Sequence, residues 1–137
     1  MKIKYPAIFK PQKPSGFFVK FPDIPEAITE GETIEECAFN ASEVLSLVLE
    51  HKMENDEPIP EPSEVKNAHL ISPDVKIQSA LLVRFNRNGK TLADIARALS
   101  TSWPVAQRLE NPKHSPTLRQ LERAAAALGK RLVLSFE

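Results

Sequence analysis

Four carboxylates gather near the start of the chain, at Asp23, Glu26, Glu30 and Glu32. Carboxylates in such a group can hold a divalent cation or act as a general acid and a general base. No histidine, serine nucleophile or glycine-rich phosphate loop accompanies them. A two-metal nuclease would need such acids on its strands, yet the predicted strand Ile3–Phe9 has none. We therefore expect these acids to serve turns and caps, and the chain not to be an enzyme.

Metal and redox chemistry has little support elsewhere in the sequence. Cys37 is the only cysteine, and the three histidines are scattered without ligand spacing. We expect Cys37 to be a small core residue. The sequence therefore predicts no catalytic residue, no metal and no cofactor.

A second group of residues has the spacing of two short helices that cross closely. Ile95, Ala96 and Leu99 lie on one side of the first helix, and Ala106 and Leu109 on one side of the second. A small residue such as Ala96 is required where the helices cross, and Ser100-Thr101 would form the turn. This pattern predicts a helix-turn-helix module, within residues 73–137, that binds double-stranded DNA.

The predicted register leaves four side chains on the outer face of the second helix, near its N-terminal end, where they can reach base edges. Arg108 is the strongest candidate, because a guanidinium can contact guanine through two hydrogen bonds. Trp103 is equally compatible with packing. The candidates for base contact are Trp103, Pro104, Gln107 and Arg108.

Cations and hydroxyls at helix starts and loops flank that face, and both kinds of group suit phosphate contact. Taken singly, each of the basic residues is more simply explained as a solvated surface charge. The candidates for phosphate contact are Lys90, Thr91, Arg97, Ser102, Lys113, His114 and Thr117.

The formal net charge of zero hides a division of charge along the chain. Residues 1–72 carry seven lysines against thirteen acids, a net charge of −6. Residues 73–137 carry eleven lysines or arginines against five acids, a net charge of +6. The second part suits a polyanion and the first suits a basic partner.

The first part is predicted to form an α+β sandwich of two layers. Alternation over Lys2–Lys10, Phe17–Phe21 and Ala27–Glu30 indicates strands, and Ala68–Ile71 indicates one more. Thr33 and Glu36 have capping-box spacing before a helix that reaches His51. Its predicted buried stripe is Ile34, Cys37, Ala38, Ala41, Val44, Leu45 and Val48.

We place a partner-binding domain at residues 1–53 (to about 72 with the linker) and an acidic, proline-rich linker with a possible strand at 54–72. The domain at 73–137 is predicted to be helical. A helix capped by Ser72 ends at Asn88-Gly89, and Thr91, Ser102 and Thr117 cap three shorter helices.

The chain is predicted to end in a strand, Arg131–Phe136. Its edge suits pairing with a second copy, so we expect a homodimer or a higher oligomer. The dimerising residues would be Leu132, Leu134 and Phe136.

The second part resembles the phage-repressor family of helix-turn-helix proteins. The resemblance is carried by TLADIARALSTSWPVAQRLENP followed by SPTLRQLERAAAALG. The sequence departs from the family at Leu92, where a phosphate-binding glutamine is frequent, and at Ser100, where the turn often has glycine. The resemblance implies binding of a palindromic operator as a dimer, with strain in the turn at Ser100.

The first part resembles the HicB antitoxin family, through YPAIF, GFFVKFPDIPEAITEGETIEECAFNASEVL and EPIPEPS. This resemblance implies a partial ribonuclease-H-like fold without a nuclease site. It also implies that the domain binds and blocks HicA, a small basic toxin that cleaves messenger RNA. The expected toxin-binding residues are Tyr5, Phe18, Asp23, Ile24 and Glu30, of which Tyr5 and Phe18 are equally compatible with the core.

The sequence therefore predicts an antitoxin that neutralises HicA and represses its own operon by binding operator DNA. The alternative is a repressor whose N-terminal domain senses a small molecule in an apolar pocket. No hydrophobic stretch is long enough for a signal peptide or a membrane anchor. We expect a cytoplasmic protein that does not bind membranes.

Overall fold

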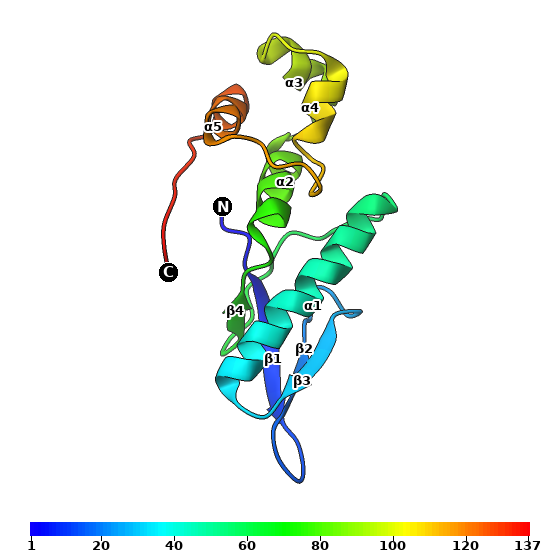
Figure 1. Ribbon diagram of the computed structural model, residues 1–137, viewed down its shortest axis with the longest axis vertical. Helices are drawn as coiled ribbons and strands as arrows, with labels where there is room; N and C mark the ends of the chain where they lie inside the picture. Colours follow the sequence, from blue (N-terminus) through cyan, green and yellow to red (C-terminus); the bar gives the residue numbers. More distant parts are fainter. The chain divides into compact units, whose positions relative to one another are not determined.

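A computed structural model describes all 137 residues, in which the chain forms two compact units, residues 1–78 and residues 79–137. We call them unit 1 and unit 2; the elements of both are labelled in Figure 1. The border lies inside helix α2 (Val75–Asn86), a few residues after the border expected at Pro73. No helix of the chain combines the length and the apolar character needed to cross a bilayer.

Unit 1 contains a four-stranded antiparallel sheet in the order β3-β2-β1-β4. The strands are β1 (Tyr5–Pro11), β2 (Phe17–Lys20), β3 (Ile28–Gly31) and β4 (His69–Ile71). The four predicted strands are confirmed, although β1 begins and ends later than the alternation suggested. Tyr5 pairs with Ile71 in the register of β1 and β4, so the strand farthest along the chain is added beside the first.

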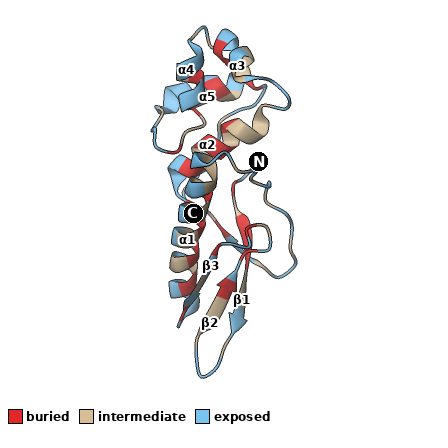
Figure 2. Cartoon of the chain, turned by 90° about the vertical axis from the view of Figure 1, so that its right-hand side faces the viewer, coloured by how far each residue is buried: buried red, intermediate tan, exposed pale blue.

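Helix α1 (Ile34–Glu54) packs on one face of this sheet (Figure 1). Its buried residues follow a spacing of four: Cys37, Ala41, Leu45 and Leu49. Cys37, Ala41 and Leu45 of the predicted stripe are confirmed as buried. Ala38, Val44 and Val48 are only half-buried, Ile34 is exposed, and Leu49, which was not predicted, is buried. Figure 2 shows the buried residues of α1 on the side that faces the sheet. The helix is thus amphipathic and joins the two layers of unit 1.

Thr33 is the N-cap of α1, as predicted, and its hydroxyl accepts a hydrogen bond from the Glu36 N–H at 3.1 Å. The return bond of a capping box is displaced by one residue, because the Glu36 carboxylate accepts from the Glu32 N–H at 3.4 Å. Only half of the predicted capping box is therefore formed.

Replacing Thr33 with alanine removes this acceptor, so we expect unit 1 to lose about 0.5–2 kcal/mol of unfolding free energy. Urea denaturation followed by circular dichroism measures the loss. Thr33→Ser keeps the hydroxyl and should retain most of the stability. Equal losses in both variants would contradict a capping role for Thr33.

The acidic segment between α1 and β4, residues 55–68, has no regular structure, but hydrogen bonds hold it against the rest of unit 1. We call it the strap. The Tyr5 hydroxyl donates to the Pro60 carbonyl at 2.7 Å. The Asp23 carboxylate accepts from the Ser63 N–H at 2.9 Å and from the Ser63 hydroxyl at 2.7 Å. The strap is therefore a bound part of unit 1.

Unit 2 is helical, with α3 (Leu92–Ala98), α4 (Trp103–Arg108) and α5 (Leu118–Ala127) following α2. Its core contains Val83, Ile95, Ala96, Ala106, Leu109, Ala124 and Leu128. The predicted caps Thr91, Ser102 and Thr117 are confirmed. The cap predicted at Ser72 is wrong: α2 is capped by Asp74, whose carboxylate accepts from the Lys76 N–H at 2.8 Å and whose carbonyl accepts the first helical bond, from Gln78.

The strand predicted over Arg131–Phe136 is absent from the single chain, in which this segment has no regular structure. Ladder hydrogen bonds require a neighbouring strand, and this segment pairs with none in its own chain. Leu134 and Phe136 are consequently exposed, while Leu132 is half-buried. We call residues 131–137 the tail.

Candidate nucleic-acid and protein-binding surfaces

Helices α3 and α4 pack against each other across a short turn, and we call them the α3–α4 pair. Ala96 and Ala106 are buried, so small side chains lie at the centre of the pair, as predicted. The Thr101 N–H donates to the Ala96 carbonyl at 2.9 Å and closes the end of α3. Ser100 has a φ of 52°, a left-handed conformation that favours glycine. The strain expected in this turn is therefore present.

The four residues predicted to contact bases are all exposed on α4, but only Trp103 and Pro104 lie at its N-terminal end; Gln107 and Arg108 are its last two residues, because the helix is shorter than expected. Their positions, at i, i+1, i+4 and i+5, fall on one side of the helix, opposite the buried Ala106. Trp103 is 48% exposed, so its ring is only partly used for packing. Trp103, Pro104, Gln107 and Arg108 thus form one surface that can face a groove of DNA.

The three hydroxyls predicted to contact phosphate all cap helices. Thr91, Ser102 and Thr117 accept hydrogen bonds from the N–H groups of Asp94, Val105 and Gln120, respectively, at 3.1, 3.4 and 3.1 Å. A hydroxyl that accepts from an N–H still has its own proton to donate. Capping and phosphate binding are therefore compatible at these positions.

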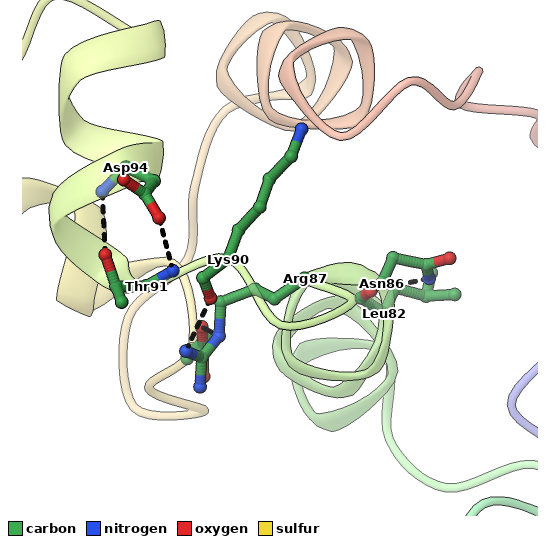
Figure 3. Close-up of polar contacts among 7 residues, drawn as sticks. Leu82, Asn86, Arg87, Lys90, Thr91 and Asp94 are labelled. Atoms are coloured by element: carbon green, nitrogen blue, oxygen red, sulfur yellow. Dashed lines mark hydrogen bonds and ion pairs between the residues drawn. The ribbon is translucent and has the colours of Figure 1, made fainter.

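The predicted phosphate-binding cations differ in their surroundings. The Lys90 ammonium donates to the Ala127 carbonyl at 3.4 Å, and Arg97 forms an ion pair with Asp94. Lys113 and His114 are exposed in the loop between α4 and α5. Figure 3 shows the side chain of Lys90 extending away from the Thr91–Asp94 cap.

The cap of α3 is reciprocal, because the Asp94 carboxylate accepts from the Thr91 N–H at 2.9 Å (Figure 3). Hydrogen bonds from the backbone and then the side chain of Thr91, together with the charge of Arg97, lower the pKa of Asp94 below its ordinary value. The folded protein therefore favours the ionised carboxylate over the protonated one.

This shift predicts how the stability of unit 2 depends on pH. A lowered pKa in the folded state stabilises the fold above the ordinary pKa, and this contribution is lost as the pH falls through the lowered value. Thermal unfolding from pH 7 to pH 2 should therefore show a smaller decrease for Asp94→Asn than for the wild type. Parallel pH profiles would show that Asp94 does not contribute.

An ion pair that the sequence did not reveal joins the end of α2 to the residues after α4. Arg87 Nε lies 2.6 Å from Glu110 Oε2, and Arg87 Nη2 donates to Glu110 Oε1 at 3.3 Å. Arg87 Nη1 also donates to the Lys90 carbonyl at 3.2 Å. Burial raises the pKa of Glu110 and outweighs the opposing charge of Arg87. The pair fixes the loop before Thr91 relative to the end of α4.

For two of the five predicted toxin-binding residues, the prediction of a surface position is wrong. Tyr5 and Ile24 are fully buried in the core of unit 1, and the Tyr5 hydroxyl is used to hold the strap. Phe18 is half-buried, and Asp23 binds Ser63. Glu30 is exposed. These residues do not form one open surface.

The clustered carboxylates of unit 1 bind four different neighbours. The Asp23 carboxylate accepts from Ser63, Glu26 pairs with Lys52, Glu30 accepts from Gln12 at 3.2 Å and Glu32 accepts from Ser15 at 2.8 Å. A hydrogen bond from Lys52 is the main cause that lowers the pKa of Glu26. No group of three His, Cys, Asp or Glu side chains is placed to hold a metal ion. The carboxylates thus serve structural contacts.

Comparisons with known proteins give matches over both units. A family model described as the HicB-like antitoxin of bacterial toxin–antitoxin systems matches residues 4–77. The chain is 33% identical over 135 residues to Antitoxin HicB of Escherichia coli (strain K12), covering 96% of this chain and 98% of that protein. Antitoxin HicB 1 of Photorhabdus laumondii is 32% identical over 136 residues, covering 98% of this chain and 88% of that protein. Antitoxin HicB 2 of the same organism is 34% identical over 133 residues, with coverages of 96% and 95%.

Proposed function

Because the chain belongs to the HicB-like antitoxin family, we propose that it neutralises a HicA toxin through unit 1 and represses its own operon through unit 2. The observation that carries the first half is that the family match over residues 4–77 coincides with unit 1, residues 1–78. Both activities are binding activities, carried out in the bacterial cytoplasm.

The net charges of the two units support toxin binding by unit 1 and DNA binding by unit 2. Unit 1 carries eight lysines against fourteen acids, a net charge of −6, and unit 2 carries ten lysines or arginines against four acids, a net charge of +6. A toxin that binds messenger RNA has a cationic surface, so an acidic unit attracts it and speeds encounter. A basic unit attracts the phosphate backbone of DNA.

We assign the α3–α4 pair of unit 2 to a helix-turn-helix of the phage-repressor type. The exposed side of α4, with Arg108 at its C-terminal end, supports this assignment, as do the hydroxyl caps at the starts of α3, α4 and α5. In this arrangement α4 enters the major groove and the flanking cations contact phosphates. The tail pairs with that of a second copy, so that a dimer contacts two operator half-sites.

Unit 1 is proposed to have a ribonuclease-H-like arrangement without a nuclease site. The structural roles of its clustered carboxylates support a binding rather than a catalytic function. The family match also favours the antitoxin over a repressor whose N-terminal domain senses a small molecule.

Co-expression of the chain with the product of the adjacent small reading frame tests the proposal. We expect the two proteins to co-purify, and the complex to shift a fragment of their own promoter in a gel. Failure of the wild-type chain to bind that product would overturn the antitoxin function. Binding of the toxin without binding of the promoter would overturn only the repressor function.

A further inference from the structure

The outward side of α1 carries acidic side chains and two large apolar side chains that lie outside the core of unit 1. The buried residues of α1 follow the line from Cys37 to Leu49, and a second line runs along the opposite side at spacings of three or four residues. All its members are exposed except Glu50, which is half-buried. We call this line the outer stripe: Glu36, Phe39, Glu43, Leu47, Glu50 and Glu54.

The apolar members lie near the middle of the outer stripe. Phe39 is 65% exposed and Leu47 is 68% exposed. Eight residues of helix separate them by about 12 Å, with Glu43 halfway between. Single exposed apolar residues are common on protein surfaces, whereas Phe39 and Leu47 lie on one line of a helix and can contact the same partner.

The charge of the outer stripe is of one sign. Four of its six members are glutamates, and none is a lysine, an arginine or a histidine. Lys52, the lysine of α1, is engaged elsewhere, in an ion pair with Glu26. Glu43 and Glu50, on either side of Leu47 along the helix, therefore place carboxylates on the same side of α1 as the two apolar residues.

We propose that the outer stripe is the surface with which unit 1 binds the toxin, receiving a cationic face of the toxin that surrounds an apolar patch. This inference rests on the proposed function and names the surface that performs it. Phe39 and Leu47 supply the apolar anchors, and the glutamates steer and orient the cationic partner. Because a toxin binds RNA phosphates through such cations, the same contact excludes RNA.

The other open face of unit 1 is less suited to this partner. The face of the sheet turned away from α1 exposes Ile28 and Leu70, whose apolar character matches that of the stripe. Lys20 pairs with Ile28 in the register of β2 and β3, and Lys10 is also exposed. Glu30 is exposed on the same face, opposite Phe18, but the two lysines beside it leave this face less attractive to a cationic surface than the outer stripe is. Charge therefore distinguishes the two faces.

The test measures the affinity of the full chain for the purified product of the adjacent small reading frame by isothermal titration calorimetry. Phe39→Ala combined with Leu47→Ala should raise the Kd at least about tenfold, the loss typical of buried anchors. Glu43→Lys should raise the Kd about tenfold at low salt and less at high salt. The matched controls are Ile28→Ala with Leu70→Ala, and Glu61→Lys in the strap; neither should change the Kd by more than about twofold.

The outcomes separate the inference from the proposed function. If the wild-type chain does not bind the product, the proposed function itself fails. If the wild type binds and the stripe variants bind equally well, the outer stripe is not the toxin-binding surface. If the variants alter only the oligomeric state of the free chain in light scattering, a second copy occupies the stripe and the inference is wrong. Unchanged circular dichroism of the variants excludes misfolding, since every replaced side chain is exposed.

Discussion

Arg108→Ala is expected to weaken binding of the promoter by at least about 30-fold while leaving the toxin complex intact. A bidentate contact between arginine and guanine contributes about 1–3 kcal/mol of discrimination, and a dimer would lose two such contacts. Arg108 is exposed at the end of α4, so its removal should leave the core of unit 2 unchanged. Fluorescence anisotropy with a labelled promoter fragment, at a fixed salt concentration, measures the change.

Arg108→Lys separates reading of bases from attraction to phosphates. Lysine keeps the charge but cannot form the planar, two-bond contact, so its affinity should stay close to that of the alanine variant. Lys66→Ala, an exposed lysine of unit 1, removes the same charge away from α4 and should change little. If Arg108→Lys bound as tightly as the wild type, Arg108 would be a phosphate contact instead.

Local features of the fold could be predicted from the sequence. The caps at Thr33, Thr91, Ser102 and Thr117 depend on hydrogen bonds between residues three apart, and such bonds are visible in the spacing alone. The small residues Ala96 and Ala106 were predicted for a similar reason, because helical periodicity places them on the inner sides of the α3–α4 pair.

Contacts between residues far apart along the chain could not be predicted. Tyr5 was expected on the toxin-binding surface, yet its hydroxyl binds Pro60, 55 residues away. Arg87 and Glu110 are 23 residues apart, and nothing in their neighbours indicates that they pair. The periodicity of α1 predicted which side of the helix is buried. It did not show that the opposite side stays uncovered, because that depends on where the sheet and the strap pack.

The apolar side chains of the tail are expected to mediate dimerisation, because the segment pairs with no strand of its own chain. Leu134 and Phe136 are exposed, and alternate residues of a paired strand point to the same face. Replacing both with serine should convert a dimer to a monomer in light scattering. Since two linked half-site contacts gain about 10²–10⁴-fold over one, promoter affinity should fall by a factor in that range.

Val133→Ser is the matched control, because Val133 is also apolar and exposed but would point to the opposite face of an extended segment. It should leave both dimerisation and promoter binding unchanged. If Val133→Ser weakened dimerisation as much as the double variant does, the tail would stabilise the dimer through its general hydrophobicity and not as a paired strand. If the double variant remained a dimer with full promoter affinity, the second copy would have to be held by another surface, and the strand predicted over Arg131–Phe136 would have no role in assembly.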